Sequence, residues 1–351
     1  MAQKYLTDNP AAAIDKAVEE LAPDLVLVTT DTNVERIVLT AFQSSRVVKE
    51  SPLIALPPGE EGKTLDNVVK IWEKLEDIGA TRRSIVLNIG GGSVSDIGGF
   101  AASTFKRGIR TINFPTTLLG AVDAATGGKT GINFNSLKNE IGSFHLPSKV
   151  IISPLPFTSL SQEEILSGYA EMVKTAIISD FDFYIRLLNI EKVLGAPELL
   201  GEAVEKCVAI KDEIVAQDPK ERGLRKILNF GHTAGHAFEV LNNSLGNHVS
   251  HGYAVAHGML VALILSHIKL GFSSEELHHY KNFLKNNYGA SLINCRDVEA
   301  VVEKMSNDKK NRRHGEPLFT LLQEIGKPAI NCALTPDEIR EALEIYIDFT
   351  A

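Results

Sequence analysis

The chain has 351 residues, of which 44% are hydrophobic and 23% charged, and its formal net charge is −8. This length suits two domains better than a single core, and the composition is that of a globular protein. The negative charge argues against a general nucleic-acid binder, because phosphate backbones need a basic face. An acidic protein can still bind an anion in a local basic pocket.

The three cysteines indicate a reducing compartment. Cys207, Cys295 and Cys332 are odd in number, far apart and form no C-x-x-C pair, so neither a disulfide framework nor a zinc knuckle is predicted. The first residues carry no basic segment followed by an apolar run, so we expect no signal peptide. The longest apolar stretch, 259–265, is too short to span a bilayer. We therefore expect a cytoplasmic protein without a membrane partner.

The first half of the chain alternates β-rich runs with helical patterns, which predicts a parallel sheet with helices on both faces. An amphipathic helix follows the second run and ends at Gly79. From Gln162 onward the pattern is nearly all helical. We therefore predict a Rossmann-like α/β domain over residues 1–155 and a mainly helical domain over residues 156–351. The predicted strands cover residues 25–30, 53–56, 84–89, 110–114 and 150–152.

A glycine-rich turn, Gly90-Gly91-Gly92-Ser93, follows the third predicted strand and opens a helix that contains Asp96. Glycines allow close backbone approach and a helix start attracts negative charge, so this context favours the pyrophosphate of a dinucleotide. It is not the G-x-G-x-x-G fingerprint, and an ordinary glycine turn is the alternative. Thr116 and Thr117 follow the next strand, at the sheet edge where such ligands bind.

A second glycine-rich segment, Gly-Gly-Lys-Thr at residues 127–130, is similar to the end of a Walker A loop. The first glycine of that motif would fall on Asp123, so the NTPase pattern fails. Lys129 and the nearby pair Lys138-Asn139 remain, with glycines that give a ligand access to them. They predict an anion site, and the identity of the anion stays open.

A histidine-rich segment marks the second half of the chain. His232 and His236 are four residues apart, on one face of a predicted helix, and Arg225 lies just upstream. His251 opens the next apolar helix. Imidazoles gathered with positive charge suggest a metal beside an anionic ligand. The alternative is a pair of histidines that serve only to pack a helix flank.

Many motifs of the chain keep the order and spacing found in one enzyme family. Besides the segments above, they include a Gly-Tyr-Ala-Glu-Met-Val-Lys run that ends at Lys174. Together they make the chain resemble the 3-dehydroquinate synthase family over almost its whole length. The motifs lie at residues 58–63, 91–96, 105–108, 115–119, 127–130, 138–139, 168–174, 225–236, 251–252 and 308–311.

The resemblance implies a fold related to that of metal-dependent polyol dehydrogenases, with NAD and Zn²⁺ or Co²⁺ as cofactors. It places the metal ligands at Glu171, His232 and His251. One carboxylate and two imidazoles leave coordination positions open for the oxygens of a substrate. By spacing alone, pairing of His232 with His236 is equally possible, and His248 is the competing choice for His251.

The resemblance also implies which residues contact NAD and the substrate. Ser159 is the weaker NAD candidate, and for the substrate we choose Lys310 over its neighbour Lys309. Arg107 is expected to reach across a homodimer interface into the neighbouring site. The implied NAD contacts are Asp31, Asn33, Glu60, Lys63, Gly91, Gly92, Ser93, Asp96, Thr116, Thr117, Lys129, Lys138, Asn139 and Ser159. The implied substrate contacts are Asp123, Lys129, Lys174, Lys211, Arg225, Asn229, His236 and Lys310.

The family reaction converts 3-deoxy-D-arabino-heptulosonate 7-phosphate to 3-dehydroquinate and phosphate. It runs through transient oxidation at carbon 5 by NAD, β-elimination of phosphate, re-reduction and an intramolecular aldol closure. The metal acidifies the hydroxyl that is oxidised. NAD is reduced and then reoxidised within one turnover, so the reaction has no net oxidation. The resemblance therefore implies a lyase that eliminates phosphate and closes a ring.

Three alternatives remain open. Another sugar-phosphate cyclase would share the cofactor sites and differ where the substrate carboxylate binds. A metal- and NAD-dependent polyol dehydrogenase is favoured slightly by Ser93, but its uncharged substrate needs no cluster such as Lys211 and Arg225. A catalytically silent paralogue would be expected to lack at least one of the implied metal, NAD or substrate contacts, and none is missing here.

Glu171 and Lys174 are one helical turn apart, and for this pair a surface ion pair is the alternative interpretation.

Overall fold

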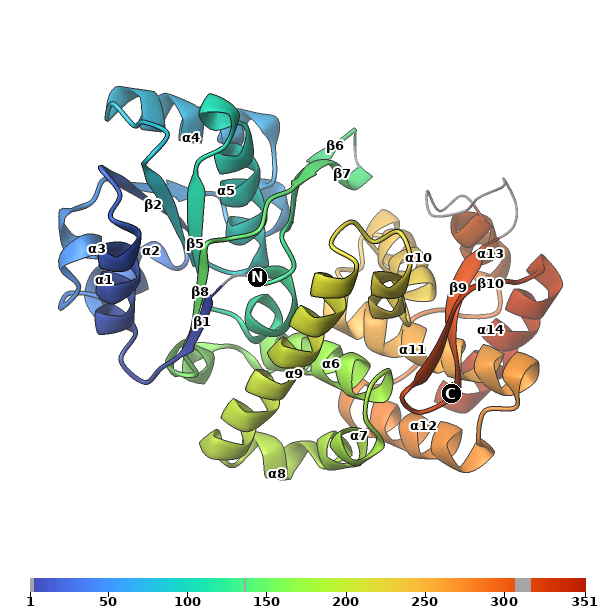
Figure 1. Ribbon diagram of the computed structural model, residues 1–351. Helices are drawn as coiled ribbons and strands as arrows, with labels where there is room; N and C mark the ends of the chain where they lie inside the picture. The colour runs from blue at the N-terminus through green and yellow to red at the C-terminus, as the bar shows by residue number, and fades with distance from the viewer. Residues whose placement is uncertain (1–2, 136, 307–316) are drawn as a thin grey trace. The chain divides into compact units, whose positions relative to one another are not determined.

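The computed structural model describes residues 3–135, 137–306 and 317–351 (Figure 1). The chain forms two compact units, Met1–Ser161 and Gln162–Ala351. Each unit has its own secondary-structure pattern and its own part of the predicted site, and each is described by itself.

The N-terminal unit is built on a six-stranded sheet with the order β1-β8-β5-β4-β2-β3. All neighbouring strands in it are parallel, which confirms the predicted α/β architecture. Each predicted strand is present within about one residue, and β1 is a strand that the sequence analysis did not anticipate. The strands are β1 (Gln3–Leu6), β2 (Val26–Asp31), β3 (Leu53–Leu56), β4 (Ile85–Gly90), β5 (Arg110–Pro115) and β8 (Lys149–Ile152).

Helices cover both faces of this sheet, as predicted. Successive residues of β2 point to opposite faces, so Val28 packs in one hydrophobic core and Leu27 in the other. The Val28 core includes Ile14 of α1, and the Leu27 core includes Val68 of α4 and Phe100 of α5. The helices are α1 (Pro10–Leu21), α2 (Glu35–Ala41), α3 (Arg46–Glu50), α4 (Leu65–Asp77) and α5 (Gly92–Thr104), with the short turns η1 (Glu60–Gly62), η2 (Phe105–Arg107), η3 (Gly120–Ala124) and η4 (Leu155–Ser159).

A two-stranded antiparallel hairpin lies outside the main sheet of this unit (Figure 1). Its strands are β6 (Lys129–Phe134) and β7 (Leu137–Phe144), and β6 packs against α5. The pairing is irregular between Ile132 and Phe134, opposite the segment that carries Lys138 and Asn139. The hairpin therefore bears three of the predicted ligand-binding side chains.

The C-terminal unit is mainly helical, as predicted, with one exception. β9 (Leu318–Glu324) and β10 (Lys327–Ala333) form an antiparallel hairpin, where the sequence analysis expected helices. The helices are α6 (Gln162–Ile177), α7 (Phe181–Leu188), α8 (Ile190–Leu194), α9 (Pro197–Gln217), α10 (His232–Ser244), α11 (His251–Leu270), α12 (Ser274–Tyr288), α13 (Val298–Ser306) and α14 (Pro336–Thr350), with the turn η5 (Leu224–Asn229).

Helix α11 is the centre of this unit and packs against α6, α10, α12, α14 and β9. Glycines let it approach its neighbours backbone to backbone. A Cβ at Gly258 would lie 2.1 Å from the Gly231 carbonyl oxygen, and one at Gly252 would lie 2.0 Å from the Ser167 carbonyl oxygen. These close approaches pack the start of α10 against α11 and the start of α11 against α6.

By length and apolar composition α11 could cross a membrane, although its longest apolar stretch seemed too short for this in the sequence. In the folded unit 72% of that apolar window is buried inside the protein. The apolar character of α11 is thus accounted for by its position in the core.

Candidate functional site

The glycine-rich turn connects β4 to α5, as the predicted nucleotide site requires. Gly91 is the N-cap residue of α5 and has no side chain with which to cap the helix. A Cβ at Gly91 would lie 3.3 Å from Thr117 Cγ2, and one at Gly92 would lie 2.9 Å from Ala124 Cβ. The glycines therefore let the segment after β5 pack directly against the helix start, where backbone amides favour an anion.

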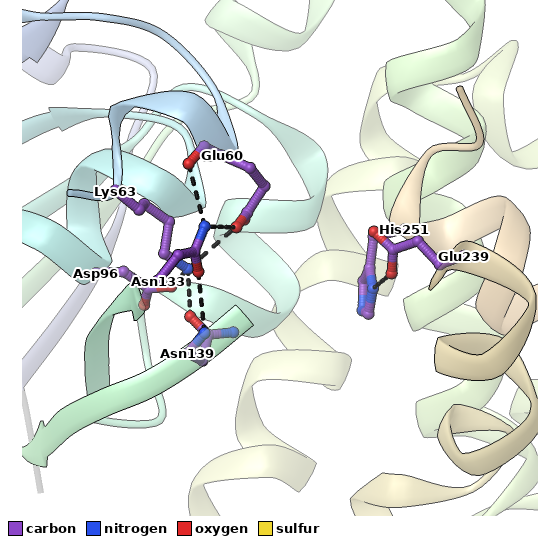
Figure 2. Close-up of polar contacts among 7 residues, drawn as sticks. All are labelled: Glu60, Lys63, Asp96, Asn133, Asn139, Glu239 and His251. Carbon is purple, nitrogen blue, oxygen red and sulfur yellow. Dashed lines mark hydrogen bonds and ion pairs between the residues drawn. The ribbon is translucent and has the colours of Figure 1, made fainter. Parts of the chain in front are cut away.

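Lys63 is the buried centre of a polar network in the same unit. Its Nζ donates to Asp96 Oδ2 at 2.8 Å and to Asn139 Oδ1, and it lies 3.5 Å from Glu60 Oε1. Asn133 Nδ2 donates to Glu60 Oε2 at 3.0 Å, and Asn133 Oδ1 accepts from the Asn139 amide at 2.9 Å. Figure 2 shows that one network joins η1, α5 and the β6–β7 hairpin. Four predicted NAD contacts are thereby brought together: Glu60, Lys63, Asp96 and Asn139.

Burial disfavours the charge on Lys63, but the carboxylates of Asp96 and Glu60 outweigh it and raise the pKa of Lys63. Burial also disfavours the charge on Asp96 and therefore raises the pKa of that carboxyl, while the Lys63 ammonium opposes this change. With the two groups 2.8 Å apart, we take both as charged at neutral pH. The network is therefore centred on a partly buried ion pair, Lys63 with Asp96, that joins a loop, a helix and a hairpin.

The other predicted NAD contacts are distributed more widely over the N-terminal unit. Asp31 lies at the end of β2, and its Oδ1 accepts from the amides of Asn33 and Val34. Thr116 is buried and its amide donates to the Gly90 carbonyl, so it adjoins the glycine turn. Ser159 is exposed and donates within its own turn to Pro156. The remaining predicted contacts are Ser93 on α5, Thr117 after β5, and Lys129 and Lys138 on the hairpin.

The three predicted metal ligands converge in the C-terminal unit. Glu171 Oε1 lies 3.5 Å from His232 Nε2 and 3.6 Å from His251 Nε2. Two donors bound at about 2.1 Å to one tetrahedral ion lie about 3.4 Å apart, so these separations fit a metal such as Zn²⁺. Glu171 comes from α6, His232 from the start of α10 and His251 from the start of α11.

His236 belongs to the same cluster. One ring nitrogen from each of His232, His236 and His251 lies within 4.8 Å of the other two, so geometry also permits the i,i+4 pair that spacing allowed. His248 is exposed and is not a member of this group of described residues. His232 Nδ1 lies 3.2 Å from the Phe230 carbonyl oxygen, which leaves Nε2 as the nitrogen that faces Glu171.

The charge of this cluster is set by two buried carboxylates. Burial lowers the pKa of His251, but hydrogen bonds and charge from Glu171 and Glu239 outweigh it and raise the pKa to about 10. The cluster therefore attracts a cation, either a proton or a metal ion. Lys174 forms an ion pair with Glu171 in which both side chains are only 1% exposed. Glu171 and Lys174 therefore do form an ion pair, but the alternative interpretation that places this pair at the surface is wrong.

The predicted substrate contacts of this unit include unusually buried cations. Lys174, Lys211 and Arg225 are at most 5% exposed, and α9, which carries Lys211, packs against α6 and η5. Arg225 Nη1 donates to the Pro219 carbonyl. Asn229 Nδ2 donates to Glu221 Oε1 at 2.6 Å. Buried cations are rare in proteins unless they are paired or bind an anion.

The remaining predicted substrate contacts lie elsewhere. Asp123 in η3 and Lys129 in β6 belong to the N-terminal unit. Arg107 is exposed, with a backbone φ of 70°, and lines a hollow of about 380 Å³ together with Arg82, Arg110 and His145. Lys309 and Lys310 lie outside the described residues.

Comparison with solved structures identifies the class of protein that has this fold. The structure of 2-epi-5-epi-valiolone synthase from Streptomyces hygroscopicus, with NAD⁺ and Zn²⁺ bound, matches 99% of this chain and 97% of its own at a TM-score of 0.86 and 22% identity. The structure of 2-deoxy-scyllo-inosose synthase complexed with carbaglucose-6-phosphate, NAD⁺ and Co²⁺ matches 97% and 96% at a TM-score of 0.83 and 24% identity. The chain thus has the fold of these synthases.

Sequence comparison is more specific. The family described as 3-dehydroquinate synthase N-terminal matches residues 53–167, and that described as 3-dehydroquinate synthase C-terminal matches residues 168–311. A 3-dehydroquinate synthase of Parabacteroides distasonis is 42% identical over 329 residues, which cover 94% of this chain and 93% of that protein. The chain belongs to the 3-dehydroquinate synthase family.

Proposed function

We propose that the chain catalyses the 3-dehydroquinate synthase reaction, the conversion of 3-deoxy-D-arabino-heptulosonate 7-phosphate to 3-dehydroquinate and phosphate. One observation carries this beyond family membership: the unit that contains the carboxylate–imidazole cluster also buries Lys174, Lys211 and Arg225. A phosphorylated sugar acid has two anionic groups for such cations, whereas a polyol has none. The free cysteines suit a cytoplasmic enzyme.

In this proposal Glu171, His232 and His251 hold the metal, and the start of α5 with the Lys63 network holds NAD. When bound, the metal supplies a Lewis acid for the substrate hydroxyl, and NAD supplies a reversible hydride acceptor. Zn²⁺ and Co²⁺ are the proposed metals, because the two synthases of this fold contain them together with NAD⁺.

The residues around the cluster orient the substrate. Lys211 and Arg225 are proposed to bind its carboxylate, and Arg225 is held in place by its bond to the Pro219 carbonyl. Lys174 holds the Glu171 carboxylate through their ion pair. The proposed phosphate contacts are Lys129, Asn229, His236, Lys310 and Arg107, with Asp123 as a further substrate contact.

The reaction is tested by measuring phosphate release from 3-deoxy-D-arabino-heptulosonate 7-phosphate with NAD and Zn²⁺, while absorbance at the NADH band is recorded. We expect one phosphate per substrate without accumulation of NADH, because the two hydride transfers cancel. Accumulation of NADH without phosphate would instead indicate a polyol dehydrogenase. Phosphate release only from a different phosphorylated sugar would indicate another cyclase. A reaction without NAD serves as the control.

We also propose a homodimer in which Arg107 completes the site of the partner copy. Arg107 is exposed and has a left-handed backbone conformation, which supports a role outside its own subunit. It also lines a basic hollow, which an anionic or polar surface of the partner copy would complement. Arg107→Ala and His251→Ala should each be inactive alone. Mixed and allowed to exchange subunits, they should regain activity, because one site of each mixed dimer has both residues. No recovery in a mixture whose exchange is demonstrated would contradict the crossing.

A further inference from the structure

The carboxylate of Glu239 lies behind the proposed metal ligand His251. Glu239 is on α10, three residues after His236 and seven after His232, so these three side chains share one helix face. Its side chain is only 6% exposed, and Oε2 lies 3.3 Å from His251 Nδ1 (Figure 2). No role was expected for Glu239 from the sequence.

His251 is held between two carboxylates, one at each ring nitrogen. Nδ1 faces Glu239 Oε2, and Nε2 faces Glu171 Oε1 at 3.6 Å. A neutral imidazole carries its proton on one nitrogen and a lone pair on the other. A proton on Nδ1 can be donated to Glu239, and the lone pair of Nε2 then points toward the cluster where a metal would bind.

A buried carboxylate at this position needs an explanation, because burial of a charge costs free energy unless the charge is paired. His251 is the first residue of α11, so Glu239 lies near the positive end of that helix, which offsets part of the cost. An apolar residue would fill the same core position without that cost. A carboxylate or amide here supplies an acceptor for Nδ1, which an apolar side chain lacks.

We propose that Glu239 is a positioning residue for the metal centre. It accepts the Nδ1 proton of His251, fixes the ring orientation and makes Nε2 a stronger donor. His232 differs, because its Nδ1 faces the neutral carbonyl of Phe230. The two imidazole ligands are therefore supported by acceptors of different charge. The inference rests on the proposed metal site.

The test compares Glu239→Gln and Glu239→Ala with the unaltered full-length chain. Zn²⁺ affinity is measured by competition with a chromophoric chelator, and the ligand field by the visible spectrum of the Co²⁺ form. Glutamine keeps an acceptor but removes its charge, so affinity should fall about 10-fold. Alanine removes both, so affinity should fall about 100-fold and the Co²⁺ bands should shift. Glu299→Gln is the control: this carboxylate of the same unit bonds Arg340 and should leave both measurements unchanged.

The outcomes separate this inference from the function proposed above. If the unaltered chain binds no metal, the metal site itself is wrong. If it binds metal and both Glu239 variants match it in affinity and spectrum, the role of Glu239 is wrong. Should the variants fail to fold, nitrogen NMR of the unaltered Zn²⁺ form, with the His251 ring signals assigned through its own backbone resonances, still decides: metal on Nδ1 would overturn the proposal.

Discussion

Replacing His251 with alanine should abolish stoichiometric metal binding and reduce turnover by about a thousandfold or more. The substitution removes one of three proposed donors and leaves Glu171 and Glu239 close together without the imidazole that lies between them. A bound metal supplies several kcal/mol of transition-state stabilisation, and about 4 kcal/mol corresponds to a factor of about a thousand. Metal content of the purified protein and the rate of phosphate release measure the two effects.

His248→Ala is the matched control for this substitution. His248 lies three residues before His251, in the loop that precedes α11, but its side chain is exposed and outside the histidine cluster. Metal content and turnover should therefore stay within about twofold of the unaltered chain. If His248→Ala lost the metal and His251→Ala kept it, the ligand assignment would be refuted.

Gly258→Ala should destabilise the C-terminal unit by about 3 kcal/mol or more and weaken metal binding as well. The added Cβ would lie 2.1 Å from the Gly231 carbonyl oxygen and 2.5 Å from the Gly235 amide nitrogen. Both are backbone atoms, so relief requires α10 and α11 to separate. That movement would carry His232 away from His251, because each begins one of the two helices.

Gly201→Ala provides the control for a glycine-to-alanine change within a helix. Gly201 is inside α9, and a Cβ there would meet no atom within 4 Å. Alanine should stabilise the helix by up to about 1 kcal/mol. Urea unfolding monitored by circular dichroism gives both free energies. Equal stability of the two variants would show that the close crossing of α10 and α11 is not required.

The buried strands of the sheet were predictable because both of their faces are mainly apolar, as the run 84–89 shows by falling within one residue of β4, which is buried throughout. The β6–β7 hairpin was not predictable, since β7 is exposed over most of its length and shows no alternation of apolar and polar residues. In β9 the run 318–322, which is apolar except for Thr320, suits a buried helix or a strand equally well. Only Gly326, with φ of 81°, marks the hairpin turn.

The candidate site was predictable where a motif marks it and not where packing alone creates it. Motif positions identified Glu171 and His251, which the fold brings together from two helices. Glu239 was missed because nothing in the sequence connects it to His251 across the intervening loop. Its spacing from His232 and His236, on the same helix face, was the available signal. The Lys63 network was likewise foreseen as separate ligand contacts and not as ion-paired neighbours.

The proposed metal ligands come from three helices that are separated along the chain, which determines when the site can form during folding. Only His232 and His236 are close enough in sequence to form a local chelate before the helices assemble. An unfolded chain therefore competes weakly for the ion, and nearly all of the binding free energy stabilises the native state. In this respect the unit is the opposite of a zinc finger, because its glycine-lined helix crossings must form first. We expect the ion to enter a scaffold that is already folded.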